Sequence, residues 1–409
     1  MKKIYLAIIG ILFCFNSFGQ FAQGCDGKRY VLDLFPTATK ATIQYATNKN
    51  VLGENQKLYM DVYTPDGDTV SQRPVIIWAY GGSFISGGKG DMESYCRAFA
   101  KKGYVTAAID YRLWPLFTLG FPTGPEVLNV VIQAVSDMRG SVRYFRKDAD
   151  KGNDFKIDPG NIILAGISAG AITALHAANL DAQDSVPPFI QTAINNNGGI
   201  GGNTGDSLML TYPYDCKAVI NLSGGLYNAK WLDANSPPFV SYHGNADAVV
   251  PYTSGIANGL LYIEGSKLLK DRSDEIGLSN YLLTVPGGGH TDIYTDTKFA
   301  TYLAEFTINA TLFLENVICG TTATKEQNSI KELKVTPNPA TDEVNIDMPL
   351  LSNYTIEVYN TLGALVSKDE LKNEEHYTLH RKGMARGLYV IHFIDEKNSK
   401  GYISRVIYE

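Results

Sequence analysis

The stretch NIILAGISAGAITALHAANL, residues 161–180, decides the fold because it joins two kinds of secondary structure through a short turn. NIILAGI is an apolar run with the length of a buried strand, whereas residues 169–180 carry the apolar pattern of a helix. Ser168 lies between them, at the centre of the pattern Gly-x-Ser-x-Gly. A strand, a turn and a helix in this order predict a sharp elbow that exposes the Ser168 hydroxyl as a nucleophile.

The pattern around Ser168 has little specificity in a chain with 39 glycines, so its surroundings must support it. Between about residue 40 and residue 318, short apolar runs alternate with helical patterns at 126–147, 169–180 and 298–317. This alternation predicts an α/β fold with a doubly wound, mostly parallel sheet, whose active site lies at the carboxyl ends of the strands. The expected strands are TIQYAT, LYMDVYT, PVIIWAY, YVTAAIDY, NIILAGI, KAVINLS, PFVSYHG and YLLTVPG.

The composition indicates a globular protein with more than one domain. The chain has 409 residues, of which 44% are hydrophobic and 19% are charged. Its formal net charge of −6 and the absence of a long basic run argue against a nucleic-acid partner.

The two ends of the chain differ from the α/β region. Residues 1–19 combine MKK with a short apolar run and small residues, which predicts a signal peptide cleaved before Gln20. We therefore expect the catalytic α/β domain to span residues 20–319. Residues 320–332 are polar and indicate a linker, and residues 333–409 alternate like the strands of a small all-β sandwich. No other stretch is long and apolar enough for a transmembrane segment.

The cysteines and histidines offer no metal-ligand spacing, so we expect neither a metal nor a cofactor. Export and an even count allow two disulfides in any of three pairings, and free thiols remain an alternative. The four cysteines beyond the signal peptide are Cys25, Cys96, Cys216 and Cys319.

A serine nucleophile needs a base and an acid. His290, in VPGGGHTD, follows the last expected strand of the α/β region, and Asp247, in HGNADAVVPY, follows the strand before it. We predict that His290 takes the proton of Ser168 and that Asp247 orients His290. The chain order Ser168, Asp247, His290 is the order found in α/β-hydrolases.

The tetrahedral intermediate also needs hydrogen-bond donors for its oxyanion. The segment WAYGGSFISGG follows a strand, and its glycines allow the backbone amides of Gly82 and Ser83 to turn toward the site. Together with the amide of Ala169 they form the predicted oxyanion hole. The phenol of Tyr80 is a rival donor.

Aromatic residues in loops are the candidates for the substrate pocket, with plain core packing as the alternative. Two segments, 112–124 and 189–215, read as irregular loops that shape the pocket. The expected pocket residues are Tyr80, Trp114, Phe117 and Trp231.

The remaining polar candidates are interpreted as structural. We expect His176 to pack within its helix, His243 to be a hydrogen-bonding residue at the rim, and Asp110 to pair with Arg112. The histidines expected to face solvent are His376, His380 and His392.

Four segments resemble the carboxylesterase and lipase branch of the α/β-hydrolases: VIIWAYGGSFISGG, AAIDYRLWP, DPGNIILAGISAGA and HGNADAVVPY. The resemblance covers roughly residues 40–318. Two features depart from it. Tyr80 stands where many members have histidine, and Asp247 stands in the setting of smaller acyl esterases rather than the glutamate of large carboxylesterases.

The C-terminal segments VTPNPATDEVNI, IEVYNTLGALV and MARGLYVIHFID resemble the sorting domain of the type IX secretion system. The resemblance implies the type IX machinery as a partner, passage across an outer membrane, and a secreted or cell-surface protein. A carbohydrate-binding or adhesive sandwich is the alternative.

The sequence thus predicts a secreted serine carboxylic-ester hydrolase that works through an acyl-enzyme. Its substrate is a small-molecule or polymer-linked ester, with the acyl chain length and the alcohol left open. The rivals are a serine exopeptidase of the same superfamily and a non-catalytic adhesin.

Overall fold

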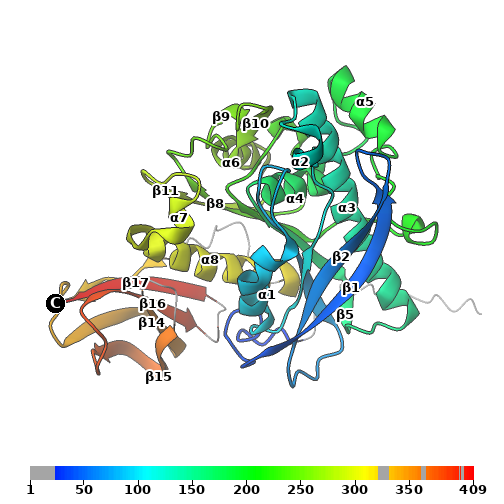
Figure 1. Ribbon diagram of the computed structural model, residues 1–409. Coiled ribbons are helices and arrows are strands. Elements are labelled where there is room, and N and C mark those ends of the chain that lie inside the picture. The colour runs from blue at the N-terminus through cyan, green and yellow to red at the C-terminus, as the bar shows by residue number, and fades with distance from the viewer. Residues whose placement is uncertain (1–23, 321–330, 361–364, 396, 398–399) are drawn as a thin grey trace, which may run out of the picture.

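The computed structural model describes residues 24–320, 331–360, 365–395, 397 and 400–409. The predicted signal peptide and most of the predicted linker lie outside these residues. The described chain forms an α/β unit and a C-terminal β unit (Figure 1).

An eight-stranded sheet forms the centre of the α/β unit. Its first three strands in spatial order pair antiparallel, and all the following neighbours pair parallel. In spatial order the strands are β1 (Ala38–Lys49), β2 (Asn55–Pro65), β4 (Val105–Ile109), β3 (Arg73–Ala79), β5 (Ile157–Ile167), β6 (Ala218–Leu222), β8 (Phe239–Gly244) and β11 (Asn280–Val285). Each of the eight expected strands is present, which confirms the predicted fold class.

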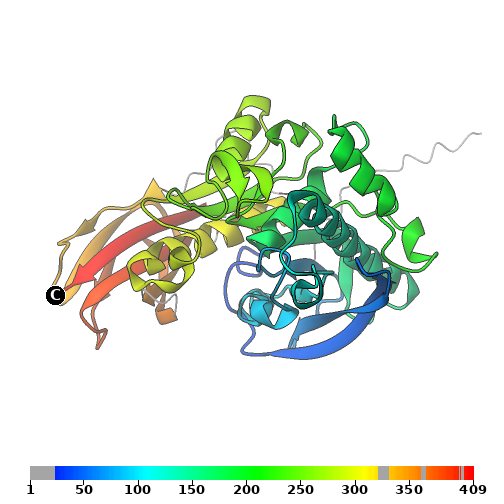
Figure 2. The same ribbon diagram turned by 45° about the horizontal axis from the view of Figure 1, so that its top comes forward.

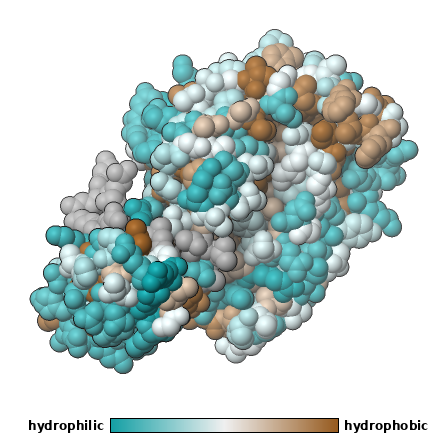
Figure 3. All heavy atoms as spheres, turned by 60° about the vertical axis from the view of Figure 1, so that its left-hand side comes forward, coloured by the Kyte–Doolittle hydropathy of each residue, from teal (hydrophilic) through white to brown (hydrophobic). Residues whose placement is uncertain are grey.

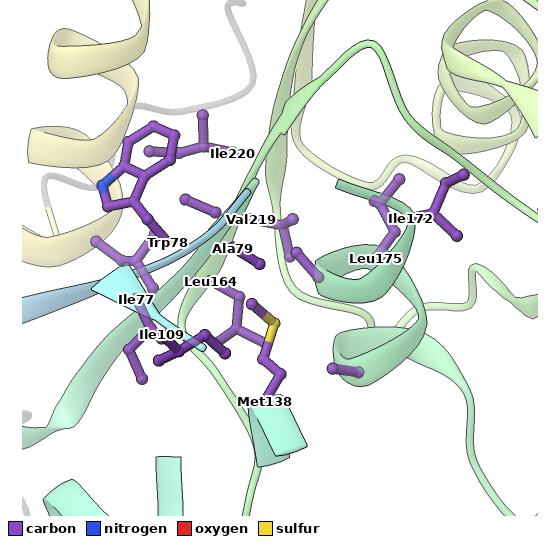
Figure 4. Packing of buried hydrophobic residues seen from close by; sticks show 14 of the residues in the cluster. Ile77, Trp78, Ala79, Ile109, Met138, Leu164, Ile172, Leu175, Val219 and Ile220 are labelled. Atoms are coloured by element: carbon purple, nitrogen blue, oxygen red, sulfur yellow. The ribbon is translucent and has the colours of Figure 1, made fainter. Parts of the chain in front are cut away.

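Helices cover both faces of this sheet (Figures 1 and 2). Trp78 of β3 contacts the ring of Phe99 in α1, whereas Met138 of α3 and Ile172 of α4 pack on the opposite side (Figure 4). The sheet is therefore buried on both faces, as its near-continuous apolar strands require. The helices are α1 (Glu93–Ala100), α2 (Leu116–Leu119), α3 (Gly124–Lys151), α4 (Ala169–Asn179), α5 (Pro188–Asn196), α6 (Ser266–Ile276), α7 (Asp292–Thr295) and α8 (Ala300–Cys319).

The three expected helices correspond to α3, α4 and α8. Helix α3 begins where Thr123 and Glu126 form a capping box, with the Thr123 hydroxyl 2.7 Å from the Glu126 carboxylate. The expected irregular loop 189–215 is partly wrong, because Pro188 begins helix α5 at its N-terminal end. The sequence analysis also missed a small sheet of β7 (Gly225–Leu226), β10 (Leu261–Gly265) and β9 (Ser254–Ala257).

The C-terminal unit is all β, as expected, and Figure 3 shows that its surface is mostly hydrophilic. Its six strands form one sheet in the order β12-β17-β16-β14-β13, and β15 pairs with β14 outside this path. Strand β12 begins at Lys331, so the C-terminal sheet starts inside the segment predicted as linker. The strands are β12 (Lys331–Glu332), β13 (Val335–Thr336), β14 (Glu343–Asn360), β15 (Leu365–His380), β16 (Gly387–Asp395) and β17 (Lys400–Tyr408).

An apolar cluster joins the two units. It combines residues of the N-terminal segment, of α8 and of β16, namely Val31, Leu32, Ile308, Leu312, Val390 and Ile394. An ion pair between Glu305 and Arg405 lies across the same junction. His392 is 1% exposed on β16, so the expectation that it faces solvent is wrong, although His376 and His380 are exposed.

A disulfide between Cys25 and Cys319 ties the N-terminal segment to the end of α8. Cys96 and Cys216 are free thiols. One bridge is therefore present among the described cysteines, instead of the two that an even count allowed.

The expected ion pair between Asp110 and Arg112 is wrong. The Arg112 guanidinium lies 2.7 Å from the Asp137 carboxylate of α3, and both side chains are buried. Asp110 accepts a hydrogen bond from the Lys89 amide at 3.2 Å. Because a buried cation needs a counter-charge within reach, Arg112 pairs with the buried Asp137 rather than with the partly exposed Asp110 nearby in sequence.

Candidate active site

Ser168 lies at the elbow between β5 and α4, with φ 54° and ψ −118°. A positive φ at a residue other than glycine is strained, and the surrounding packing has to hold it. A Cβ at Gly166 would lie 2.2 Å from the Gly170 carbonyl carbon, and one at Gly170 would lie 2.1 Å from the Ala79 oxygen. Both flanking glycines are therefore required by the close approach of α4 to β3 and β5.

The structure brings Ser168, His290 and Asp247 together from three separate loops. His290 Nε2 lies 2.8 Å from Ser168 Oγ, and His290 Nδ1 lies 2.7 Å from Asp247 Oδ2. With Nδ1 donating to the carboxylate, Nε2 is free to accept the hydroxyl proton of Ser168. This is the geometry of a nucleophile, a base and an orienting acid.

The Asp247 carboxylate accepts four hydrogen bonds. Oδ1 accepts from the amides of Val249 and Val250 at 2.8 and 2.9 Å. Oδ2 accepts from His243 Nε2 at 3.2 Å and from His290 Nδ1. Burial alone would raise the pKa of Asp247, but the hydrogen bonds from His243 and His290 outweigh it and hold that pKa well below its ordinary value. The Asp247 carboxylate is therefore ionised in the folded protein near neutral pH.

His243 extends this network into the core. Its Nδ1 lies 2.7 Å from Ser266 Oγ, which also accepts from the Asn221 amide at 3.0 Å. Because Asp247 and the Val250 carbonyl are both acceptors for His243 Nε2, that nitrogen carries the proton, and Ser266 donates to Nδ1. The expected structural role of His243 fits this arrangement, but the residue is fully buried rather than at the rim.

The loop after β3 also lies close to Ser168. A Cβ at Gly81 would lie 3.3 Å from the Ser168 Cβ. Gly82, Ser83 and Phe84 have φ values of 116°, 55° and 64°, an unusual run of left-handed backbone. The described residues provide no hydrogen-bond acceptor for the amides of Gly82, Ser83 and Ala169. These amides are thus available to a ligand oxygen beside Ser168, and their role as an oxyanion hole stays a prediction.

A cavity opens directly beside Ser168. It is lined by residues of the Gly82 loop, of α3, of α4, of the Asp247 loop and of the β9–β10 hairpin, namely Ser83, Phe84, Val127, Ser168, Ala169, Ile172, Val249, Val250, Ala257, Asn258, Leu260 and Leu261. The sequence analysis did not predict that this hairpin or Val127 would line a cavity. The available signal was the Asn258–Gly259 pair between two short apolar runs, which is typical of a tight hairpin turn.

None of the four aromatic residues predicted for the pocket lines this cavity. The Tyr80 ring stacks on Tyr111 and its hydroxyl donates to the Tyr111 carbonyl at 3.4 Å, so it is not available to an oxyanion. Trp114 is buried and donates to the Gly120 carbonyl at 2.8 Å. Phe117 projects fully into solvent.

Trp231 lies in a separate aromatic cluster. Its ring stacks on Tyr227 and makes an edge contact with His176. His176 itself is buried in α4, where burial lowers its pKa to about 4, and it is held by the Ile172 carbonyl at 2.7 Å. His176 is therefore a packed helix residue, as expected.

None of the helices that the structure describes combines the length and apolarity needed to span a membrane.

Family comparisons match two separate parts of the chain. Residues 60–225 match the family described as BD-FAE, and residues 334–409 match the secretion system C-terminal sorting domain. The second match indicates export through type IX secretion, to the cell surface or beyond.

The curated relatives are named as esterases or as a hydrolase. A probable isoprenylcysteine alpha-carbonyl methylesterase of Oryza sativa subsp. japonica is 32% identical over 31% of this chain and 27% of its own length. The esterase LipC of Mycobacterium tuberculosis is 24% identical over 60% of each chain. This chain spans between 21% and 60% of the length of such relatives.

Solved structures share the fold of the α/β unit. The thermophilic esterase of Thermogutta terrifontis with propionate bound superposes with a TM-score of 0.50 at 20% identity, over 71% of this chain and 97% of that chain. The same esterase phosphorylated by paraoxon gives a TM-score of 0.50 at 21% identity, over 73% and 99%. Residues 60–225 are thus similar to the family described as BD-FAE, within a unit that shares its fold with solved esterases, and residues 334–409 are similar to the secretion system C-terminal sorting domain.

Proposed function

We propose that this chain is a secreted serine carboxylic-ester hydrolase that works through an acyl-enzyme. The observation that carries the proposal is the continuous hydrogen-bonded path from Ser168 through His290 to Asp247. The match of residues 60–225 to an esterase family and the esterase names of the relatives support the same reaction class.

Ser168 Oγ attacks the ester carbonyl carbon while His290 Nε2 takes its proton. The carbonyl oxygen becomes an oxyanion that accepts from the amides of Ala169 and of Gly82 or Ser83. The resulting imidazolium of His290 is stabilised by the ionised Asp247 and donates its proton to the leaving alcohol. Water then takes the place of the alcohol, His290 removes its proton, and hydrolysis of the acyl-enzyme returns Ser168 and releases the acid.

The proposal includes the route of export. Residues 1–19 serve as a signal peptide, and the sorting domain at the C-terminal end directs passage across the outer membrane. The catalytic unit between them acts on its ester outside the cell.

Covalent trapping tests the assignment of Ser168. Paraoxon, which phosphorylates the Thermogutta terrifontis esterase, should add one diethylphosphoryl group to the wild type, located on Ser168 by peptide mass spectrometry. Ser168→Ala should remain unlabelled, whereas Ser185→Ala, at an exposed serine, should be labelled like the wild type. A wild type that is labelled on another serine, or that resists labelling, would overturn the assignment.

A further inference from the structure

The cavity beside Ser168 is small and aliphatic. Apart from Ser83, Ser168 and Asn258, its lining side chains are apolar, and none carries a charge. Its volume is about 30 Å³. A group of the size of a water molecule or a methylene needs roughly 10–15 Å³ of cavity volume. The cavity therefore holds about two or three groups of that size.

The positions of the donors decide which half of an ester enters this cavity. The leaving alcohol must lie against His290 Nε2, because it receives its proton there. The carbonyl oxygen must lie against the amides beside Ser83 and Ala169. His290 does not line the cavity, whereas Ser83, Ser168 and Ala169 do. The substituent that points into the cavity is therefore the acyl chain and not the alcohol.

We propose that this cavity is the acyl site and that it selects linear saturated acyl groups of about three or four carbons, since about two or three groups fit beyond the carbonyl carbon. The inference rests on the proposed ester hydrolysis and narrows its substrate class. Apolar walls favour a saturated chain and disfavour a charged one, because a carboxylate would lose its hydration without a partner. The alcohol side remains free to carry a larger group.

The β9–β10 hairpin supplies four of the twelve residues in the cavity wall, so we expect it to set the length limit. Ala257, Leu260 and Leu261 belong to this wall, with Asn258 at the turn between them. The Asn258 backbone amide donates to the Val249 carbonyl at 2.9 Å, and its side chain donates to Ser83 Oγ at 3.2 Å. The hairpin is thereby attached both to the loop of Asp247 and to the loop of the candidate oxyanion donors.

Two substitutions in the hairpin should move the preference in opposite directions. Leu260 is only partly buried, so Leu260→Ala enlarges the cavity at a small cost to folding. Ala257 is buried, and Ala257→Val adds two methyl carbons to the wall. Leu208→Ala, at an exposed leucine outside the cavity, is the matched control.

The measurement is kcat/KM of the full chain for p-nitrophenyl acetate, butanoate, hexanoate and octanoate. The wild type and Leu208→Ala should prefer butanoate and lose about tenfold or more on hexanoate, the scale of one or two misplaced methylenes. Leu260→Ala should shift the optimum to hexanoate, and Ala257→Val should shift it to acetate. These ratios compare substrates within one variant, so they do not depend on how much of that variant folds.

Octanoate hydrolysed as fast as butanoate by the wild type would overturn the acyl-site inference while leaving ester hydrolysis intact. Profiles that stay unchanged in both hairpin variants would do the same. If no ester in the series is cleaved, the proposed function itself fails, and this inference fails with it.

Discussion

His243 shares one carboxylate oxygen of Asp247 with His290. Both imidazoles donate to Oδ2, at 3.2 Å from His243 Nε2 and 2.7 Å from His290 Nδ1. His243 is in turn held by Ser266 at 2.7 Å, at the N-terminal end of α6. The acid of the candidate triad is thus positioned by a buried histidine four residues before it in the chain.

Replacing His243 should therefore change the pH dependence of catalysis. In His243→Ala, Asp247 loses a neutral donor and concentrates more negative charge on His290, which favours the protonated imidazole. The acidic limb of kcat/KM should move to higher pH, and the rate should fall by roughly tenfold for a lost positioning hydrogen bond. The measurement is the pH profile of ester hydrolysis between about pH 5 and pH 8.

Two further variants give that experiment its controls. His243→Gln retains an amide donor and should recover part of the rate and of the original pH profile. His380→Ala, at an exposed histidine of the C-terminal unit, should behave as the wild type. A slower His243→Ala enzyme with an unshifted acidic limb would mean that His243 only supports the fold.

The ion pair between Arg112 and Asp137 should dominate the stability of the segment before α3. Asp137→Asn leaves the guanidinium of Arg112 buried without a counter-charge, which costs about 3–5 kcal/mol. Urea denaturation followed by fluorescence should show this loss of unfolding free energy. Asp110 is close to Arg112 in the sequence but does not pair with it in the fold. Asp110→Asn should therefore lower the free energy of unfolding by less than about 1 kcal/mol. Equal losses in both variants would contradict the pairing.

Glu315 should make the protein less stable as the pH rises. It is 3% exposed on α8, and burial, with a contribution from Asp26, raises its pKa to about 7. Between an unfolded pKa of about 4.3 and this folded value, the folded state binds more protons, so stability falls with increasing pH.

Thermal unfolding of Glu315→Gln tests this sign. The variant should melt at a higher temperature than the wild type above about pH 7, and the difference should shrink toward about pH 4. The control is Glu275→Gln, which removes the same charge at an exposed position of α6. A variant that is less stable than the wild type at alkaline pH would show that the Glu315 carboxylate is compensated in the fold.

The features that could be predicted from the sequence are those encoded by residues close together in the chain. Apolar runs such as 161–167 marked the parallel strands, and the glycines around Ser168 marked the elbow, because both depend on neighbouring residues. The candidate triad could be proposed from the sequence because its members follow β5, β8 and β11, parallel strands whose carboxyl ends lie at one edge of the sheet.

What the sequence did not predict depends on contacts between distant segments. Trp114 precedes α2 and Phe117 lies within it, three residues further along the chain, yet Trp114 is buried and Phe117 is exposed. His392 alternates with Val390 and Ile394 on one face of β16, and that face is covered by α8 and the N-terminal segment. Part of the cavity wall is formed by the β9–β10 hairpin. Its composition is ordinary, so its position beside Ser168 could not be predicted from the sequence.

The most direct test of the account is hydrolysis of p-nitrophenyl butanoate by the wild type beside Ser168→Ala. We expect an active wild type and a variant whose kcat falls by several orders of magnitude while the fold, monitored by circular dichroism, is unchanged. His290→Ala should fall by a comparable amount, because the two residues act as one unit. An Ser168→Ala variant that retains wild-type activity would contradict the central claim.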